Sequence, residues 1–192
     1  IKAIEKFEAL YGETDVEIYS APGRSEISGN HTDHQRGRVL AAAVNLHAVA
    51  AVAANGTNQI RIQSKGYPLC IVELDSLSPR EDEINTTPAL IRGVAAKFTE
   101  LGCQVAGFDA YIESSVLPGS GLSSSAAFEV LMGTILNELF FEKKLSPIEI
   151  AQIGQYAENV YFGKPCGLMD QMASSVGGMI YIDFADSENL IV

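Results

Sequence analysis

The amino-acid sequence predicts an α+β domain in which helices cover a mixed β-sheet. Strand-like segments dominate the first half of the chain, whereas segments with helical periodicity dominate the second half. The chain has 192 residues, of which 47% are hydrophobic, and this is enough for one domain with a substantial core. No internal repeat or low-complexity segment interrupts the pattern.

The first segments predict a helix, a strand and a loop. Apolar residues recur with helical spacing from Ile1 to Leu10, and Gly12 is expected to end this helix. Alternating side chains predict a short strand over Val16–Ser20. The polar, glycine-dotted stretch from Pro22 to Gly37 is expected to form a loop.

Buried strands are expected to follow this loop. Val39–Ala54 is almost wholly small and apolar, which predicts buried strands around a turn near Asn45. Asn55-Gly56 is a strong turn signal, and the segments Gln59–Ser64 and Leu69–Leu74 are predicted as further strands.

Helices dominate the rest of the chain. Thr87-Pro88 opens a helix that Gly102 ends, and its predicted apolar face consists of Leu90, Ile91, Val94, Ala95, Phe98 and Leu101. Phe108–Glu113 alternates like a strand. The remaining expected elements are helices over Ala127–Leu139, from the capping box Ser146–Glu149 towards Tyr161 and over Leu168–Ser175, and a last strand over Met179–Phe184.

The bulk properties exclude several classes of partner. A formal net charge of −11 argues against nucleic acid or an anionic membrane surface as the main partner. No apolar run in the sequence is long enough to span a bilayer. Cys70, Cys103 and Cys166 lack metal-binding spacing, so we expect reduced thiols in a cytoplasmic protein.

The most informative segment is Leu117–Ala126, which contains two glycines and three consecutive serines and runs into an apolar helix. Glycines let the backbone approach a ligand, and a helix N-terminus offers unpaired N–H groups and a partial positive charge. The segment therefore favours a phosphate-binding loop, which supplies the local positive field that an acidic protein needs for nucleotide phosphates. It lacks the lysine of the common P-loop. The alternative is an ordinary glycine-serine turn that caps a helix.

A second candidate cluster lies in the polar stretch from Ala21 to His34. Arg24, Asn30, His31 and Asp33 are suited to a polyhydroxylated ligand, because carboxylates and amides bond sugar hydroxyls and arginine holds phosphate or carboxylate oxygens. Two alternatives are a solvated surface loop and a metal site formed by the segment 31–34.

A third cluster follows the break at Gly163 and extends to Gln171. Asp170 is expected in the first turn of a short helix, where it either stabilises the helix or acts on a substrate hydroxyl, as a proton acceptor or as an orienting charge. Cys166 is expected to be a buried small side chain rather than a nucleophile. Glu158 is expected on the polar part of the preceding helix, as a solvated surface residue or as a magnesium carboxylate, and the sequence favours the former.

Together the three clusters resemble the GHMP small-molecule kinases, and among them the galactokinase family. The resemblance is carried by Pro118–Ala126, by Gly23-Arg24 with Gly29–Asp33, and by Cys166–Gln171, and it covers nearly the whole chain. It implies that residues 1–192 form the ribosomal-protein-like N-terminal domain of these kinases, a mixed sheet packed with helices. It also implies a C-terminal ferredoxin-like domain, with a further glycine-rich motif, that is absent from this chain.

The resemblance implies a role for each matching residue. Arg24 and Asp170 would form the catalytic pair, and Asn30, His31 and Asp33 would bind the sugar. The phosphates of ATP would lie against Gly119, Ser120, Gly121, Leu122, Ser123, Ser124 and Ser125. Ser125 (or Ser124) and Glu158 would hold Mg²⁺.

The first motif departs from the usual family pattern, Gly-Arg-Val-Asn-Leu-Ile-Gly-Glu-His-Thr-Asp-Tyr. This chain has Ser25-Glu26-Ile27-Ser28 after Arg24, Asn30 in place of Glu, and His34 in place of Tyr. In the family, the Glu at this position contacts O6 of the sugar. Because this chain has Asn30 there, the identity of its sugar is left undetermined. The resemblance implies transfer of the ATP γ-phosphoryl group to the anomeric hydroxyl of galactose. The alternatives are a kinase for another sugar, such as N-acetylgalactosamine, and a sensor that binds sugar and ATP without turnover.

Overall fold

A six-stranded mixed sheet forms the base of the domain in the computed structural model, which describes residues 2–186 and 191–192. The strand order is β1-β2-β5-β3-β4, and β6 pairs with β2. Strands β3 and β5 are parallel, whereas the other pairs are antiparallel. The strands are β1 (Glu17–Ser28), β2 (Arg38–Ala54), β3 (Gln59–Ser64), β4 (Cys70–Glu73), β5 (Phe108–Ser114) and β6 (Met179–Asp183).

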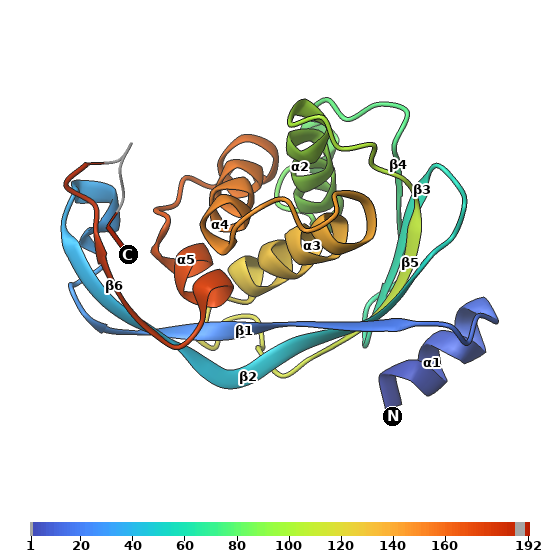
Figure 1. The fold of residues 1–192 in the computed structure, drawn as a ribbon, viewed down its shortest axis with the longest axis horizontal. Coiled ribbons are helices and arrows are strands. Elements are labelled where there is room, and N and C mark those ends of the chain that lie inside the picture. The colour runs from blue at the N-terminus through green and yellow to red at the C-terminus, as the bar shows by residue number, and fades with distance from the viewer. Residues whose placement is uncertain (1, 187–190) are drawn as a thin grey trace.

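Four helices cover one face of this curved sheet, and the first helix packs on the opposite face (Figure 1). The α-helices are α1 (Lys2–Tyr11), α2 (Thr87–Glu100), α3 (Ser124–Phe140), α4 (Pro147–Tyr156) and α5 (Met169–Val176). Short 3₁₀ turns are η1 (Thr32–Gln35) and η2 (Glu81–Glu83), and α4 continues into a π-helical segment, η3 (Ala157–Phe162). Among the described residues, no helix is long and apolar enough to cross a membrane. The α+β prediction is confirmed.

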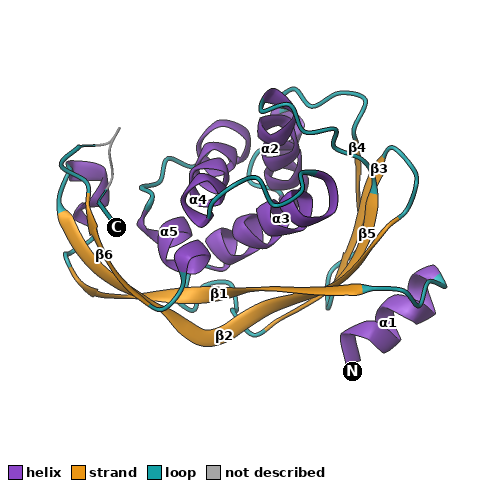
Figure 2. Cartoon of the chain, in the orientation of Figure 1, coloured by secondary structure: helices purple, strands orange, loops and turns teal. Residues whose placement is uncertain are grey.

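Two apolar clusters hold the helices on the sheet. The larger cluster lies between the sheet and α2, α3 and α4, and it includes the fully buried Phe98, Phe108 and Leu131. The second cluster joins α5 to β2 and β6 through Met169 and Met172. The helix α5 is therefore fixed against the sheet by its apolar face (Figure 2), and this holds Asp170, in its first turn, in a defined place.

The strands β1 and β2 are longer than the sequence predicts. The expected loop from Pro22 to Gly37 is wrong in its first part, because β1 continues to Ser28. Pro22 lies at an irregularity in the β1–β2 register, where a residue without an N–H is tolerated. This part of β1 has polar side chains on both faces, since Arg24 is buried and Glu26 is half-buried whereas Ser25 is exposed, so this edge strand looks like a loop in sequence.

The expected turn near Asn45 is also wrong, because β2 is a single 17-residue strand. Pro22 pairs with His47 and Arg24 pairs with Ala43, so the pairing moves two residues along β1 but four residues along β2. The extra residues form a bulge that bends the strand. The long, bent β2 lets one strand pair with β5 at one end and β6 at the other.

The helix boundaries need smaller corrections. The helix α3 begins at Ser124, three residues before the predicted start, so Ser124 and Ser125 belong to its first turn and Ser123 is its N-cap. Leu101 follows the end of α2 and is 47% exposed, so it does not join the buried face of that helix. The capping box predicted at Ser146 and Glu149 is confirmed, and it begins α4.

Candidate active site

The glycine-serine loop leads directly into an uncapped helix N-terminus. Gly119 and Gly121 adopt left-handed conformations with φ of 75° and 77°, and nothing within 4 Å would meet a Cβ at either residue. Ser123 also has a positive φ, of 57°, and its side chain makes no capping hydrogen bond to α3. The alternative of an ordinary serine cap is therefore not supported, and the helix terminus keeps its capacity for an anion.

Arg24 and Asp170 form a bidentate ion pair beside this loop. The Arg24 Nε and Nη2 groups donate to Oδ1 and Oδ2 of Asp170 over 2.6 and 2.8 Å. The Arg24 Nη1 group donates to the backbone carbonyl of Gly121 over 2.7 Å. The structure thus brings the pair implied by the resemblance, Arg24 and Asp170, together beside the glycine-serine loop. The Arg24 side chain is 9% exposed and that of Asp170 is 30% exposed, so the carboxylate is the more accessible partner.

A glycine in β1 makes the close approach of the loop possible. The backbone N–H of Arg24 donates to the carbonyl of Leu122 over 3.0 Å. A Cβ at Gly23 would lie 2.9 Å from that same carbonyl oxygen and 3.0 Å from Val116. Any side chain at this position would push the loop away from β1. The Gly-Arg pair thus serves two purposes, since the glycine admits the loop and the arginine binds it.

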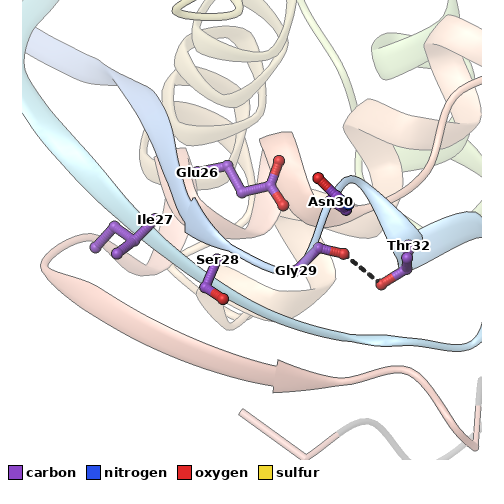
Figure 3. A pocket seen from close by; sticks show the side chains of 6 residues that line it. All are labelled: Glu26, Ile27, Ser28, Gly29, Asn30 and Thr32. Carbon is purple, nitrogen blue, oxygen red and sulfur yellow. Dashed lines mark hydrogen bonds between the residues drawn. The ribbon is translucent and has the colours of Figure 1, made fainter.

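The turn after β1 presents the residues expected to contact sugar. Asn30 and His31 are both left-handed, with φ of 56° and 50°. The backbone N–H of His31 donates to Glu26 Oε1 over 2.9 Å, and His31 Nε2 lies 2.9 Å from Glu26 Oε2. Glu26 and Asn30 both line a hollow of about 720 Å³ (Figure 3). Sequence reasoning did not include Glu26 among the site residues.

Asp33 is held against the start of α5. Its Oδ2 atom accepts the backbone N–H of Met169 over 3.1 Å, and its side chain is 8% exposed. A Cβ at Gly167 would lie 1.8 Å from that oxygen, so only glycine fits there. Asp33 also lines a smaller hollow of about 300 Å³ together with Cys166. The described residues contain no group of three or more His, Cys, Asp or Glu side chains able to hold a metal ion, so the metal-site alternative at residues 31–34 gains no support.

Glu158 is buried, which corrects the expectation of a solvated surface residue. It is 3% exposed because it lies in η3, where π-helical winding changes the face that each residue presents. Its Oε1 atom accepts the Ser125 hydroxyl over 3.2 Å and lies 3.5 Å from Lys164 Nζ. A hydroxyl and a carboxylate from two elements are oxygen donors of the kind that Mg²⁺ takes alongside substrate phosphates. The residues present therefore fit Mg²⁺.

A buried polar network supports Glu158 from behind. The Gln171 Nε2 group donates to Glu158 Oε2 and to Glu129 Oε2, each over 3.0 Å. Glu129 is wholly buried, and burial, followed by the nearby Glu158 charge, raises its pKa well above its usual range. Cys166 is only half-buried, which corrects the expectation of a buried side chain, but burial still raises its pKa to about 12 and so disfavours a nucleophilic thiolate. The sequence analysis did not identify Gln171 or Glu129 as site residues. The acidic residue Glu129, isolated in an apolar stretch of α3, was a sequence signal for a buried polar site.

Family models match two parts of the chain. The model described as "GHMP kinases N terminal domain" matches residues 89–178, and the "Galactokinase galactose-binding signature" matches residues 5–54. The first match includes the glycine-serine loop and Asp170, and the second includes Arg24 and the turn after β1.

Curated relatives and solved structures agree with these models. A galactokinase from Streptomyces coelicolor is 37% identical over 95% of this chain and 48% of its own length. A galactokinase from Lacticaseibacillus casei is 35% identical over 89% of this chain and 44% of its own length. The crystal structure of Lactococcus lactis galactokinase complexed with galactose superposes with a TM-score of 0.88 at 28% identity, over 98% of this chain and 50% of that one.

A more distant neighbour shares the fold alone. The Methanococcus jannaschii mevalonate kinase structure has a TM-score of 0.75 at 17% identity, over 90% of this chain and 55% of that one. The chain spans about half the length of the curated relatives it matches. From the two family models, the relatives and the fold together, this chain belongs to the GHMP kinase superfamily, on its galactokinase branch.

Proposed function

We propose that the protein containing this chain is a sugar kinase that transfers the γ-phosphoryl group of ATP to the anomeric hydroxyl of galactose. The observation that carries the proposal is the Arg24–Asp170 pair, whose guanidinium also reaches the carbonyl of Gly121 in the glycine-serine loop. The Arg24 side chain thereby joins the Asp170 carboxylate to the loop that precedes the N-terminus of α3, and that terminus is suited to an anion. Phosphoryl transfer needs this combination, because it depends on positioning and on neutralising charge.

Each group has a defined task in this proposal. The loop from Gly119 to Ser125 holds the phosphates with backbone N–H groups. Both Asp170 oxygens receive hydrogen bonds from Arg24 and keep a further lone pair, with which the carboxylate orients the sugar hydroxyl or accepts its proton. Arg24 stabilises charge that develops on the transferred group. Mg²⁺, held by Ser125 and Glu158, would supply neutralisation of the phosphate charge when bound.

The proposal also assigns the residues that bind the sugar, a second domain and the cellular compartment. Asn30, His31 and Asp33 contact hydroxyls of galactose, in keeping with the galactose-binding signature over this region. A C-terminal domain completes the cleft in the whole protein, in keeping with the share of the relatives that this chain covers. The whole protein works in the cytoplasm, in keeping with the three free cysteines of the described chain.

The test is a panel of free sugars with the complete protein, ATP and Mg²⁺. We expect galactose to stimulate ADP release and phosphorus NMR to detect galactose 1-phosphate. A second candidate, a sensor that binds sugar and ATP without turnover, is motivated by Asn30, which replaces the glutamate usual in the family. Binding of galactose and ATP with no ADP release would favour that candidate. ADP release with N-acetylgalactosamine but not with galactose would show that N-acetylgalactosamine is the substrate.

A further inference from the structure

Glu26 lies on the same face of β1 as Arg24, the arginine of the proposed catalytic pair. In this part of β1, Arg24, Ser25 and Glu26 pair in unbroken register with Ala43, Ala42 and Ala41 of β2. Side chains two residues apart on a strand project from one face, about 7 Å apart. Arg24 points to Asp170, so Glu26 lies one step further along the same face, towards the turn that contains Asn30.

The carboxylate of Glu26 is fixed, yet it keeps capacity for a ligand. Its side chain is 12% exposed, and each of its oxygens has one contact with His31, at 2.9 Å. A carboxylate oxygen has two lone pairs, so each oxygen can accept one more hydrogen bond. Figure 3 shows the carboxylate of Glu26 and the side chain of Asn30 on one side of the turn, whereas Ile27 and Ser28 point elsewhere.

The backbone of the turn is constrained at Gly29, next to Asn30, whose side chain is exposed. The Thr32 hydroxyl donates to the carbonyl of Gly29 over 2.8 Å, and a Cβ at Gly29 would lie 2.6 Å from the carbonyl oxygen of Arg38. Asn30 adopts a left-handed conformation that asparagine tolerates better than most residues. Its amide supplies donors that a carboxylate lacks.

The two positions exchange the residue types of the usual motif. The family pattern has Asn at position 26 and Glu at position 30, whereas this chain has Glu26 and Asn30. One carboxylate and one amide therefore remain in the same hollow, with their places reversed. A second carboxylate at position 30 would face Glu26 and repel it.

We propose that Glu26 and Asn30 form the specificity-determining pair of the sugar site, which recognises hydroxyls at the end of the ring away from the anomeric carbon. The inference rests on the proposed function, which places the anomeric hydroxyl at Asp170. In a pyranose, C4 and the C6 hydroxymethyl group lie opposite C1, which is where a carboxylate one step along β1 would meet them. A hydroxyl there donates to Glu26 and accepts from the Asn30 amide.

The test measures kcat/KM of the complete protein for galactose and its 2-, 4- and 6-deoxy analogues. We expect Glu26→Gln to lower kcat/KM for galactose by about 10- to 100-fold, mainly through KM, as for loss of a charge-assisted hydrogen bond. The loss should be at least about tenfold smaller with the 4-deoxy or the 6-deoxy sugar, and undiminished with 2-deoxygalactose. Glu17→Gln, at the other end of β1, serves as the control and should change nothing.

The exchange variants decide where the carboxylate acts. Asn30→Glu alone should lower kcat/KM for galactose, whereas Glu26→Asn combined with Asn30→Glu should recover it to within about fivefold. The inference is overturned if Asn30→Glu alone raises kcat/KM, or if Glu26→Gln has an equal effect on galactose and all three analogues. Thermal unfolding checks that each variant is folded. In Glu26→Gln the introduced amide oxygen can still accept the backbone N–H of His31, so we expect this variant to keep the turn.

Failure of the proposed function gives a different result. If the wild-type protein phosphorylates no sugar, the kinase proposal fails, but galactose binding can still be measured by saturation-transfer NMR. Weakened binding in Glu26→Gln and recovery in the exchange variant would then support the specificity pair. Unchanged binding in Glu26→Gln would overturn it.

Discussion

The Asp170→Asn variant tests the ion pair at the centre of the site. The substitution keeps the size of the side chain but removes the charge and places an amide donor against the Arg24 guanidinium. Two hydrogen bonds of 2.6 and 2.8 Å are affected. Arg24 stays 9% exposed and retains the carbonyl of Gly121 as a partner. We therefore expect the variant to fold, with an uncompensated cation next to the glycine-serine loop.

The magnitudes follow from this geometry. Removing one partner of a fully buried ion pair costs about 3–5 kcal/mol. The Asp170 side chain is 30% exposed, so water compensates part of this loss, and we expect the free energy of unfolding to fall by about 2 kcal/mol. Turnover should fall at least about 100-fold, which corresponds to about 2.7 kcal/mol of transition-state stabilisation. Affinity for ATP should change little, because the loop and α3 are untouched.

The assay compares two variants of the complete protein. Urea unfolding gives stability, coupled ADP release gives kcat, and calorimetry gives nucleotide affinity. Asp109→Asn is the matched control, because Asp109 also holds an arginine, Arg61, by two bonds, of 2.7 and 2.6 Å. Asp109 pairs with Ala53 of β2, whereas Arg24 pairs with Ala43 of the same strand. The two ion pairs are therefore ten residues apart along β2, which is about 33 Å. The control should lose at least as much stability, because the Asp109 side chain is 8% exposed and also accepts a hydrogen bond from Asn55, and it should keep its turnover. Near-normal turnover in Asp170→Asn would remove Asp170 from catalysis.

Three further predictions concern other groups around the site. Gly167→Ala should lower the free energy of unfolding by about 2 kcal/mol or more, because its Cβ would lie 1.8 Å from Asp33 Oδ2, and an unchanged urea midpoint would refute this. Burial raises the pKa of Glu129, so the folded protein keeps a proton that the unfolded chain loses above about pH 4.5. Without metal, the free energy of unfolding of the wild type should therefore fall above that pH by up to about 1.4 kcal/mol per pH unit more than that of Glu129→Gln. Parallel plots of this free energy against pH for the two proteins would contradict the prediction. Because burial raises the pKa of Cys166 to about 12, its alkylation at pH 8 in the folded protein should be at least about 100-fold slower than that of an exposed thiol, and rapid labelling found by mass spectrometry would count against it.

The convergence of Arg24, Asp170 and the loop could be predicted because each motif carries its own local signal. The glycines, the serines and the helix start are all visible in sequence, and the family resemblance joins motifs that are far apart in the chain. The full extent of β1 and β2 could not be predicted. Their pairing depends on a two-residue bulge near Asn45, which only the register between the strands reveals.

Burial of Glu158 could not be predicted for a related reason. Helical periodicity places it on a polar face, but α4 winds into a π-helix at Ala157 and turns Glu158 inward. Its hydrogen-bond partners come from two other helices, since Gln171 lies on α5 and Ser125 on α3. A polar network spread over three elements leaves no periodic pattern in any one of them. Glu26 escaped notice because its segment was interpreted as a loop rather than a strand.

A crystal structure of the complete protein with galactose and a non-hydrolysable ATP analogue would show directly whether Asp170 and the glycine-serine loop hold the two reacting groups. We expect the anomeric oxygen of galactose within about 2.6–3.2 Å of an Asp170 carboxylate oxygen, and the γ-phosphate of the analogue between Arg24 and the start of α3. A sugar bound away from Asp170, or phosphates bound away from the glycine-serine loop, would contradict it.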